Sequence, residues 1–542
     1  MSSAPSVQRT PASRAGFISP PPEVAITNAF ERSFDNAVAT ARTCYSSTGI
    51  ISEEKVVPSP PADEEIRRKK AEARDRLAQD LYQAGHHTTL QHSSFQFAVS
   101  NVSRHFIWSF LHSHPFYNSE QVSQRYVTVK DGSYAIPPLE GEALAVYRKT
   151  VESQNAAYRE LCEILVPLVE REYFGRRFVT RARRPEPWRK EIQKKAQEIA
   201  RYALPVATFA YLYHTVSGLT LLRYYRTMGQ FDTPMEQRMV VEMMVQRLLE
   251  HDPSWKAIME EPIPQEETVE FGVMASHPTD DDSARDFVAE FDAGLEGRTS
   301  KLVDWSAGNE TILAQSVREI FGLTRSRMPD EEAIALALDP GRNTYLGETL
   351  NTTTHSKLSR ALFHPRFTFR KKLSHTADSQ NQRHRMTPGS RPIMVTHFTG
   401  EPDVITPPIV AEDPAVHDVY RRAMDGAWKG IARLRALGVA DEHALYLLPN
   451  AVAIRFTEST DLLNLRHKLA MRLCYNAQEE IWRASLDEAD QICGVNPSIG
   501  RYLLPPCTLR LMAKTTPICP EGRRYCGERV WTYSLDQYQR LI

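Results

Sequence analysis

The sequence of 542 residues predicts two similar units in tandem, each containing both helices and strands. Three pairs of segments support this prediction. A helical stretch opens each half at 30–47 and 309–322, a His-x-x-Phe-x-Phe strand then begins at His92 and His364, and a Leu-Pro pair follows at Leu204-Pro205 and Leu448-Pro449. The order is kept while the spacing differs, which indicates duplication followed by divergence.

Periodicity supports the individual elements. The two-residue spacing of Phe95 and Phe97 puts both rings on one face of a strand, and the second half repeats the pattern. Apolar residues recur at helical spacing over 156–169 and 416–434. The proline of each Leu-Pro pair would interrupt a helix or begin a new one.

Length and composition fit two globular domains. At roughly 100–200 residues per domain, a chain of this length holds two to four units. The chain is 42% hydrophobic and 25% charged, and its 66 basic and 67 acidic residues leave a net charge of −1, which indicates no particular partner. No apolar run approaches the roughly 20 residues of a membrane-spanning helix, so we expect no membrane role.

The ends and the middle of the chain complete the predicted organisation. Residues 251–300 are acidic and punctuated by Pro and Gly, so we interpret them as a linker or insertion between domains at 25–250 and 301–542. A Pro- and charge-rich segment at 51–73 is a second insertion, and we place both outside the cores. The remaining 1–24 is predicted to be a disordered tail.

The number of cysteines indicates the cellular compartment in which the protein works. Seven cysteines in so long a chain argue against a disulfide framework, so we expect a cytoplasmic protein. Residues 1–22 are rich in Ser, Pro and Ala and contain Arg9 and Arg14 but no acidic residue, as an organelle transit peptide also would. The three prolines at 20–22 favour the disordered tail instead.

The sharpest local signal is Gln380-Asn381-Gln382-Arg383-His384-Arg385. On a helix, Gln380 and Arg383 share a face, so an amide and a guanidinium can hold one ligand together. The planar guanidinium suits phosphate, because it donates two parallel charge-assisted hydrogen bonds. Taken alone, such a basic triplet is more often a solvated turn.

In context, this segment resembles the signature of the flavin-dependent thymidylate synthases, Gln-x-x-Arg-His-Arg followed seven residues later by Ser-x-Arg-Tyr. Leu448-Pro449, Arg455, Arg472 and the run 477–481 are similar to the conserved elements that follow it in that family. In the first half, 85–92 resembles the family's Gly-His-x-Ser/Thr-x-x-Glu-His element, and 118–126 resembles the end of the signature. The resemblance covers about residues 25–245 and 300–530.

Each half lacks a different part of that signature. His112-Ser113-His114 stands where the first half should carry Arg-His-Arg, and the second-half loop is shortened to 386–392 without Asn or Tyr. In the family, two subunits share one nucleotide. The two halves of this chain can therefore complement each other, because each keeps the part of the signature that the other has lost. The alternative is that the signature decayed at random in both halves. The expected substrate-binding residues are Ser123, Arg125, Tyr126, Gln380, Arg383, Arg455 and Arg472, with Arg383 and Arg472 also catalytic.

The flavin site implied by the resemblance is less complete. The family Glu before the strand His is Gln91 in one half and Phe363 in the other. Its Asn-x-Arg element is 461–463 by strict spacing, or 464–466 if a helical turn was lost. The expected cofactor-binding residues are Thr88, Gln91, His384, Arg385, Arg466 and Asn476. If these are structural groups in salt bridges, no flavin is bound.

The resemblance implies an α+β fold in each half, with an antiparallel sheet flanked by helices, and a homodimer of fused chains that imitates the family's homotetramer. It also implies reductive methylation of dUMP, in which methylenetetrahydrofolate supplies the carbon and NADPH reduces FAD. The family uses no protein nucleophile, so the arginines would act by positioning and charge. The alternatives are a degenerate nucleotide-binding or regulatory protein, or a flavoenzyme acting on another pyrimidine nucleotide.

Two further signals are weaker. Cys507, Cys519 and Cys526 could form a zinc site with Cys493, but no Cys-x-x-Cys pair is present, so we predict no metal. The basic run 176–195 could contact nucleic acid, although acidic residues interrupt it and a solvated helix surface is the better interpretation.

Overall fold

The structure is a computed structural model that describes residues 16–112, 116–130, 132–175, 188–229 and 232–542. Two four-stranded antiparallel sheets form its framework. The first has the order β1 (Glu23–Ala29), β2 (Ser94–Ser103), β4 (Phe209–Ser217), β3 (Asn118–Gln121). The second has the order β5 (Ser300–Trp305), β6 (Arg366–Ser374), β8 (Ala453–Asp461), β7 (Gly389–Ser390). The matching order fits a duplication, and the predicted α+β class is confirmed.

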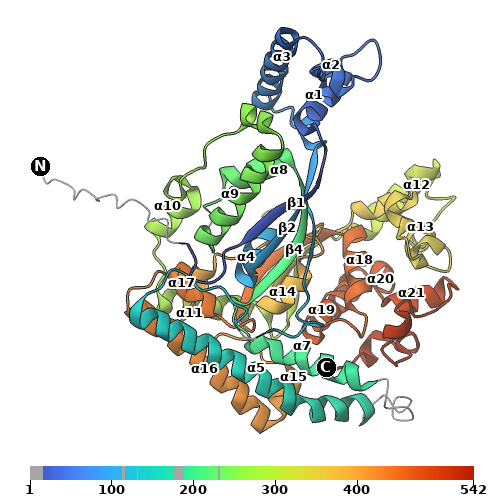
Figure 1. Ribbon diagram of the computed structural model, residues 1–542. Helices are drawn as coiled ribbons and strands as arrows, with labels where there is room; N and C mark the ends of the chain where they lie inside the picture. The colour runs from blue at the N-terminus through green and yellow to red at the C-terminus, as the bar shows by residue number, and fades with distance from the viewer. Residues whose placement is uncertain (1–15, 113–115, 131, 176–187, 230–231) are drawn as a thin grey trace, which may run out of the picture.

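Helices surround both sheets (Figure 1). In the first half they are α1 (Ser33–Thr43), α2 (Glu53–Val56), α3 (Glu64–Gln83), α4 (Arg104–Leu111), α5 (Gly141–Gly175), α7 (Arg189–Ala200), α8 (Gly218–Arg226) and α9 (Pro234–His251). Between the halves lie α10 (Val269–Ser276) and α11 (Asp281–Leu295). The second half contains α12 (Asn309–Phe321), α13 (Asp330–Leu338), α14 (His375–Asn381), α15 (Pro408–Glu412), α16 (Pro414–Ala436), α17 (Asp441–Ala444), α18 (Leu462–Arg472), α19 (Glu479–Val495), α20 (Pro497–Gly500) and α21 (Pro506–Met512).

The elements form where periodicity and capping favour them. Phe95, Phe97, Phe367 and Phe369 are all fully buried on the core faces of β2 and β6, as the two-residue spacing predicts. Two equivalent serines end these strands and cap the next helices. Ser103 accepts a hydrogen bond from a backbone N–H of α4, and Ser374 does the same for α14, which is the preferred role of Ser at a helix start.

The two halves share a core rather than meeting only at their surfaces. The long helices α5 and α16 lie side by side in Figure 1, and buried side chains of both halves, including Trp108, Val206, Leu373 and Trp428, belong to one apolar cluster. The two Leu-Pro segments pair with each other, because Val206 N donates to the Leu448 carbonyl at 2.8 Å. The Leu-Pro pairs therefore belong to the junction between the halves.

The prediction that residues 251–300 lie outside the cores is wrong for part of this segment. Within 251–300, Trp255 is fully buried in the first-half core and Phe291 of α11 is 5% exposed. Asp292 of α11 pairs with Arg455 of β8. The acidic composition suggested a solvated segment, but single apolar side chains and one carboxylate anchor it to both halves.

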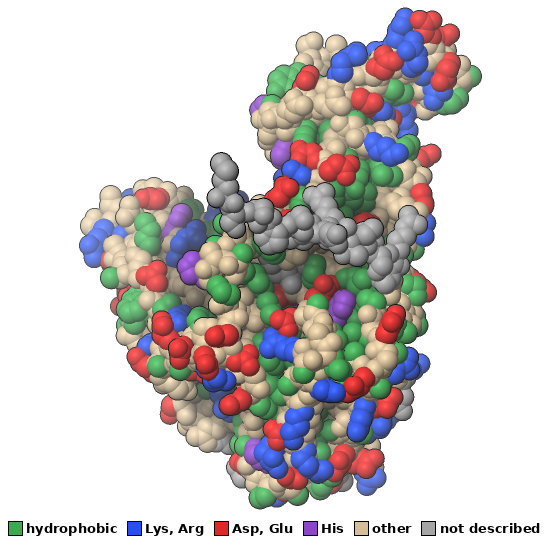
Figure 2. Space-filling view, turned by 90° about the vertical axis from the view of Figure 1, so that its left-hand side faces the viewer, with side chains coloured by type: hydrophobic (Ala, Val, Ile, Leu, Met, Phe, Trp, Pro, Cys, Tyr) green, Lys and Arg blue, Asp and Glu red, His purple; other side chains and the backbone are tan. Residues whose placement is uncertain are grey.

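The predicted tail and the 51–73 insertion also differ from expectation. Residues 16–24 lie against the fold, since Ile18 N donates to the Ile136 carbonyl at 2.8 Å and β1 begins at Glu23; residues 1–15 lie outside the described ranges. The helices α2 and α3 project from the body, and Figure 2 shows Lys, Arg, Asp and Glu side chains mixed over the tip of this arm. Val56 nevertheless belongs to the first core. Within the described ranges, no helix combines the length and apolarity that a membrane crossing requires.

Candidate active site between the two halves

Residues expected to hold one nucleotide come together at the boundary of the two halves. Arg125 follows β3 of the first half, and its Nη2 donates to the carbonyl oxygen of Asn476, after α18 of the second half, at 2.6 Å. Arg383 follows α14, and its Nη2 donates to Oε1 of first-half Glu120 at 2.9 Å. The two intact parts of the signature thus face each other across this boundary.

Five guanidinium groups gather here: Arg104, Arg125 and Arg201 from the first half, and Arg383 and Arg472 from the second. Burial, together with the charges of Arg201 and Arg383, lowers the pKa of Arg104 to about 9. Burial and the charges of Arg125 and Arg383 likewise lower the pKa of Arg472 to about 10. Like charges so close together favour a bound anion.

Few carboxylates compensate this cluster. Glu198 of α7 is 4% exposed and accepts hydrogen bonds from Arg125 and from Lys195. Burial alone would raise the pKa of Glu198, but the charges of Arg125, Lys195 and Arg201 hold it well below its ordinary value. Glu120 is mostly exposed, with 72% of its side chain accessible. The cluster therefore keeps a surplus of positive charge.

Two amides and a histidine complete the second-half side. Gln380 Nε2 donates to Gln478 Oε1, which also accepts from Arg201 Nη2 at 2.7 Å. The Oε1 atom of Gln380 is buried and has no hydrogen-bond partner. Arg472 donates through Nη2 to the Gln380 carbonyl at 2.8 Å and through Nε to His384 Nε2 at 2.9 Å. Burial, and then the charge of Arg472, lowers the pKa of His384 well below its ordinary value, so His384 is a neutral acceptor.

The remaining predicted substrate-binding residues, Ser123, Tyr126 and Arg455, have different surroundings from one another. Ser123 lies beside Arg125, whose backbone N–H donates to its hydroxyl at 3.2 Å. Tyr126 is 47% exposed, and its ring is contacted by Arg125, Lys194 and Arg524. Arg455 has a fully buried side chain on β8.

Arg455 is held by two carboxylates and not by the arginine cluster. Its Nε and Nη2 donate to Asp292 at 2.8 Å each, and Asp403 binds its other side. This pairing occupies the guanidinium fork, which favours a structural role over substrate binding.

Two adjoining cavities along β3 form a groove between the halves. One, of about 400 Å³, is lined by Gln91, Ser94, Phe116, Tyr117, Asn118, Thr215, Val216, Ser217, Thr220 and Arg385. The other, of about 430 Å³, shares Tyr117, Asn118, Thr215 and Arg385 with the first and adds Arg383. Arg385 also donates to Asn118 Oδ1 at 2.9 Å, so a second-half cation lies over a first-half wall.

The predicted cofactor residues divide between this groove and other places. Gln91 and Arg385 line the groove, and His384, next to Arg385 in the sequence, contacts Arg472. Thr88 is exposed before a short 3₁₀ turn and does not line the groove. Arg466 is 5% exposed inside α18, and its Nε has no hydrogen-bond partner.

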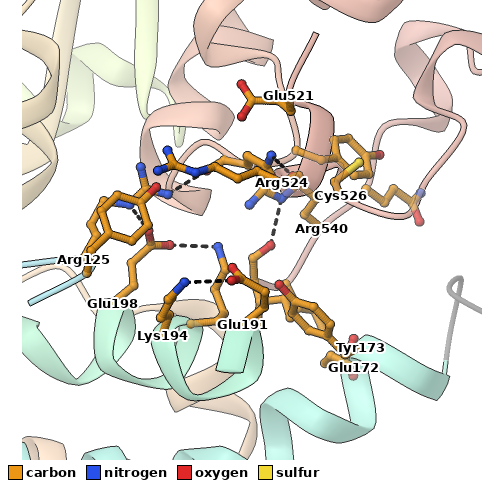
Figure 3. Close-up of a pocket in the computed structure, with 17 residues that line it drawn as sticks. Arg125, Glu172, Tyr173, Glu191, Lys194, Glu198, Glu521, Arg524, Cys526 and Arg540 are labelled. Atoms are coloured by element: carbon orange, nitrogen blue, oxygen red, sulfur yellow. Dashed lines mark hydrogen bonds and ion pairs between the residues drawn. The ribbon is translucent and has the colours of Figure 1, made fainter. Parts of the chain in front are cut away.

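A third cavity, of about 590 Å³, has Arg125 in its lining (Figure 3). Glu191, Lys194 and Glu198 reach it from α7 of the first half, while Arg524 and Cys526 reach it from the second. Asn476, a predicted cofactor residue, lines this cavity rather than the groove, and donates to the Arg524 carbonyl at 2.5 Å. Of the basic run 176–195, residues 176–187 lie outside the described ranges, and Lys194 pairs with Glu191 at 2.8 Å.

At the pseudo-equivalent position, where the roles of the halves are exchanged, described side chains of both halves pack against one another. Since Ser103 and Ser374 begin equivalent helices, His112 occupies the position of Arg383; Ser113 and His114 lie outside the described ranges. Asp378 of α14 fills the space: it accepts from Trp108 Nε1 at 2.8 Å and from Arg391 Nη2 at 2.8 Å, and its carboxylate is 3.4 Å from His112 Nε2. Asp378 is fully buried.

Two residues beside the proposed site, Arg104 and Arg201, are not predicted by the sequence, and Gln478 belongs to the family-like run 477–481 without being assigned to the site. Arg201 lies three residues before Leu204, and its second-half equivalent, by the spacing of the Leu-Pro pairs, is the apolar Leu445. That asymmetry was readable in the sequence. The position of Arg104 at the first turn of α4 gave no such signal, because only the packing of α4 and α14 brings it near Arg383.

Comparison with protein families matches residues 26–254 and 301–498 to the family described as thymidylate synthase complementing protein. The flavin-dependent thymidylate synthase of Clostridium tetani is 28% identical over 197 residues, which span 35% of this chain and 66% of that protein. The enzyme of the same name from Sulfolobus acidocaldarius is 27% identical over 39% of this chain and 78% of its own length. The one from Geobacter sulfurreducens is 30% identical over 31% of this chain and 70% of its own length. With two matched segments that together cover most of its length, the chain belongs to the thymidylate synthase complementing protein family.

Proposed function

We propose that the chain is an FAD-dependent thymidylate synthase that methylates dUMP reductively, with methylenetetrahydrofolate as carbon donor and NADPH as reductant. The observation that carries this proposal is the convergence of Arg104, Arg125, Arg201, Arg383 and Arg472 from both halves at one boundary. A nucleotide monophosphate supplies the dianion that such a cluster favours. Family membership supports the same reaction.

The polar groups of the cluster suit the two ends of a pyrimidine nucleotide. Arg125 and Ser123 offer a guanidinium and a hydroxyl to the phosphate from the first half. Gln380 and Gln478 offer amides that can donate to and accept from a pyrimidine edge. The buried and unpartnered Oε1 of Gln380 gives such a ligand a specific acceptor to satisfy.

Arg383 and Arg472 are the proposed catalytic residues. Methylation at C5 requires negative charge to build up on the pyrimidine carbonyl oxygens, and guanidinium groups fixed nearby stabilise that charge. Arg472 is already oriented by the Gln380 carbonyl and by His384. Because His384 is neutral, it orients Arg472 without adding another positive charge.

The groove along β3 is the proposed cofactor site. Its amide and hydroxyl donors, Gln91, Asn118, Ser217 and Thr220, and the guanidinium of Arg385 fit a polar, phosphate-bearing group, and the cavity sizes suit a large ligand. When bound, FAD would supply the hydride for the reduction. Arg385 and Asn118 would hold it at the boundary of the halves, and Arg383 lies at the end of the groove toward the substrate site.

A nucleotide-binding protein without flavin is the second candidate. The observation in its favour is the placement of Arg466 inside α18, outside the groove, together with Gln91 in place of the family Glu. In that case the arginine cluster binds the nucleotide and no reduction follows. We further propose that two fused chains associate as a homodimer in either case.

An absorbance spectrum of the purified chain separates the two candidates. The enzyme is expected to show flavin absorption, to lose it on anaerobic addition of NADPH, and to release tritium from [5-³H]dUMP when methylenetetrahydrofolate is present. A colourless chain that dUMP stabilises against heat, with no tritium release after added FAD, would establish the binding protein instead. A chain that neither binds flavin nor responds to dUMP would refute both.

A further inference from the structure

Four of the seven cysteines line one small enclosed cavity in the second half. Cys474 follows α18, Cys507 lies in the first turn of α21, and Cys519 and Cys526 lie in the segment after α21. The cavity has a volume of about 10 Å³, the space of roughly one water-sized particle. All seven cysteines of the chain are free thiols.

The backbone around three of these sulfurs is arranged alike. The N–H of Glu528 donates to Cys526 Sγ at 3.4 Å. The backbone N–H groups of Asn476 and Glu521 likewise hydrogen-bond to Cys474 and Cys519. In each case the donor is two residues after the cysteine. Such donors stabilise a charged sulfur, so they favour thiolate ligands.

As they stand, no three His, Cys, Asp or Glu side chains in the described part of the chain converge closely enough to coordinate an ion. All four cysteines line the shared cavity, and coordination of one ion would require rotamer changes that bring their sulfurs together in it.

We propose that Cys474, Cys507, Cys519 and Cys526 bind one Zn²⁺ ion as a structural site. Four soft sulfur ligands around a single ion-sized cavity match the closed tetrahedral coordination of structural zinc and leave no open position for catalysis. Each thiol that becomes a ligand releases its proton to solvent as the Zn–S bond forms, and no redox change is involved. Cys493, on α19, is not among the residues that line the cavity.

The ion would tie the segment after α21 to the end of α18. Cys474 lies between Arg472 of the arginine cluster and Asn476, whose carbonyl receives Arg125. The same cavity wall includes Asn476 and Glu521, which also line the cavity of Figure 3. Bound zinc would therefore fix the loop that connects the arginine cluster to this part of the second half.

The test uses the purified full-length chain, with zinc measured by mass spectrometry and Co²⁺ as a spectroscopic substitute. We expect one zinc ion per chain and, after exchange, the strong thiolate-to-cobalt charge-transfer absorption and intense visible bands of tetrahedral sulfur coordination. Removing zinc with a chelator should lower the melting temperature, and adding Zn²⁺ should restore it.

Cysteine variants test which residues bind the zinc ion. Cys519→Ser with Cys526→Ser should abolish zinc retention and the cobalt bands, whereas the matched control Cys493→Ser should leave both unchanged. Absence of zinc and of cobalt-thiolate absorption in the native chain would overturn the proposal, and so would an equal loss in Cys493→Ser. Because the native chain gives a decisive spectrum by itself, a double variant that fails to fold does not weaken the test.

Discussion

The Nη2 of Arg125 donates a 2.6 Å hydrogen bond to the carbonyl oxygen of Asn476, so a first-half arginine is held by the second-half segment that follows Arg472. This contact joins the two parts of a signature that neither half contains in full. It places the proposed nucleotide site at the internal boundary of the chain.

Arg125→Ala and Arg383→Ala should both weaken dUMP binding, although the residues lie in different halves. Each change removes a charge-assisted contact, at a cost of about 2–4 kcal/mol, which corresponds to roughly 30- to 900-fold in Kd. Isothermal titration calorimetry measures the effect. Arg422→Ala, on the exposed face of α16, is the control and should bind dUMP normally. Unchanged affinity in either test variant would separate that residue from the site.

Each chain should bind one nucleotide, not two. The pseudo-equivalent site is filled by Asp378 with Trp108 and Arg391, and it has His112 where an arginine would be needed. Calorimetric titration of dUMP into chain of known active concentration gives the stoichiometry. Two equivalent nucleotides per chain would show that this space opens in solution.

Arg455→Met should destabilise the fold more than it affects binding. The change leaves Asp292 and Asp403 without their shared cation, and breaking such a pair costs about 3–5 kcal/mol when it is buried; the partial exposure of Asp292 points to the lower end. Urea denaturation measures the free energy of unfolding. The exposed Arg422→Met should change it by less than about 0.5 kcal/mol. A large loss of dUMP affinity at unchanged stability would restore Arg455 to the substrate site.

The chain should lose stability as the pH falls from about 6.5 toward 4. Burial lowers the pKa of His105 to about 4. Burial, followed by the charges of His105, His112 and Arg104, lowers the pKa of His375 to about 3 against the opposing charge of Asp378. The unfolded chain therefore binds more protons in this range, and stability is complete only above the unfolded pKa of about 6.5. At pH 5 each histidine should cost on the order of 2 kcal/mol.

The variant His105→Phe checks this assignment. It removes one titrating ring from the contact of α4 with α14, so the slope of unfolding free energy against pH between pH 4 and pH 6.5 should fall. His417→Gln, on the exposed side of α16, should leave the slope as it was. An unchanged slope in His105→Phe would assign the acid sensitivity to other groups.

The local features of the fold could be predicted from the sequence because they depend on neighbouring residues. The alternating phenylalanines of β2 and β6 predicted buried strand faces, and all four rings are buried. The acidic composition of 251–300 predicts a solvated segment, and this prediction fails because composition is also a local property. Composition averages over a segment, whereas Trp255 and Asp292 anchor it by single contacts with distant residues.

The site was predicted in part. The pattern of Gln380, Arg383 and Arg472 predicts the second-half wall of the proposed site, and the non-overlapping losses predict that first-half Arg125 lies near it, where the structure places it. Arg455 follows the Leu-Pro pair at the family spacing, but its two carboxylate partners, Asp292 of α11 and Asp403 of a loop, lie far from it in the sequence. Arg104 was missed, because nothing near it in the sequence is typical of a site.

By itself, the sequence determined the duplication, the periodicity of the strands and helices, and the residue types that suit an anionic nucleotide. Tertiary structure decided which of these residues meet: Arg125 meets Asn476 of the second half as well as Glu198 of its own half, and Cys474 lies with the three late cysteines in place of Cys493. The reason is physical. Periodicity and capping act over a few neighbouring residues, whereas a binding site depends on how helices such as α4, α14 and α18 pack after the chain has folded.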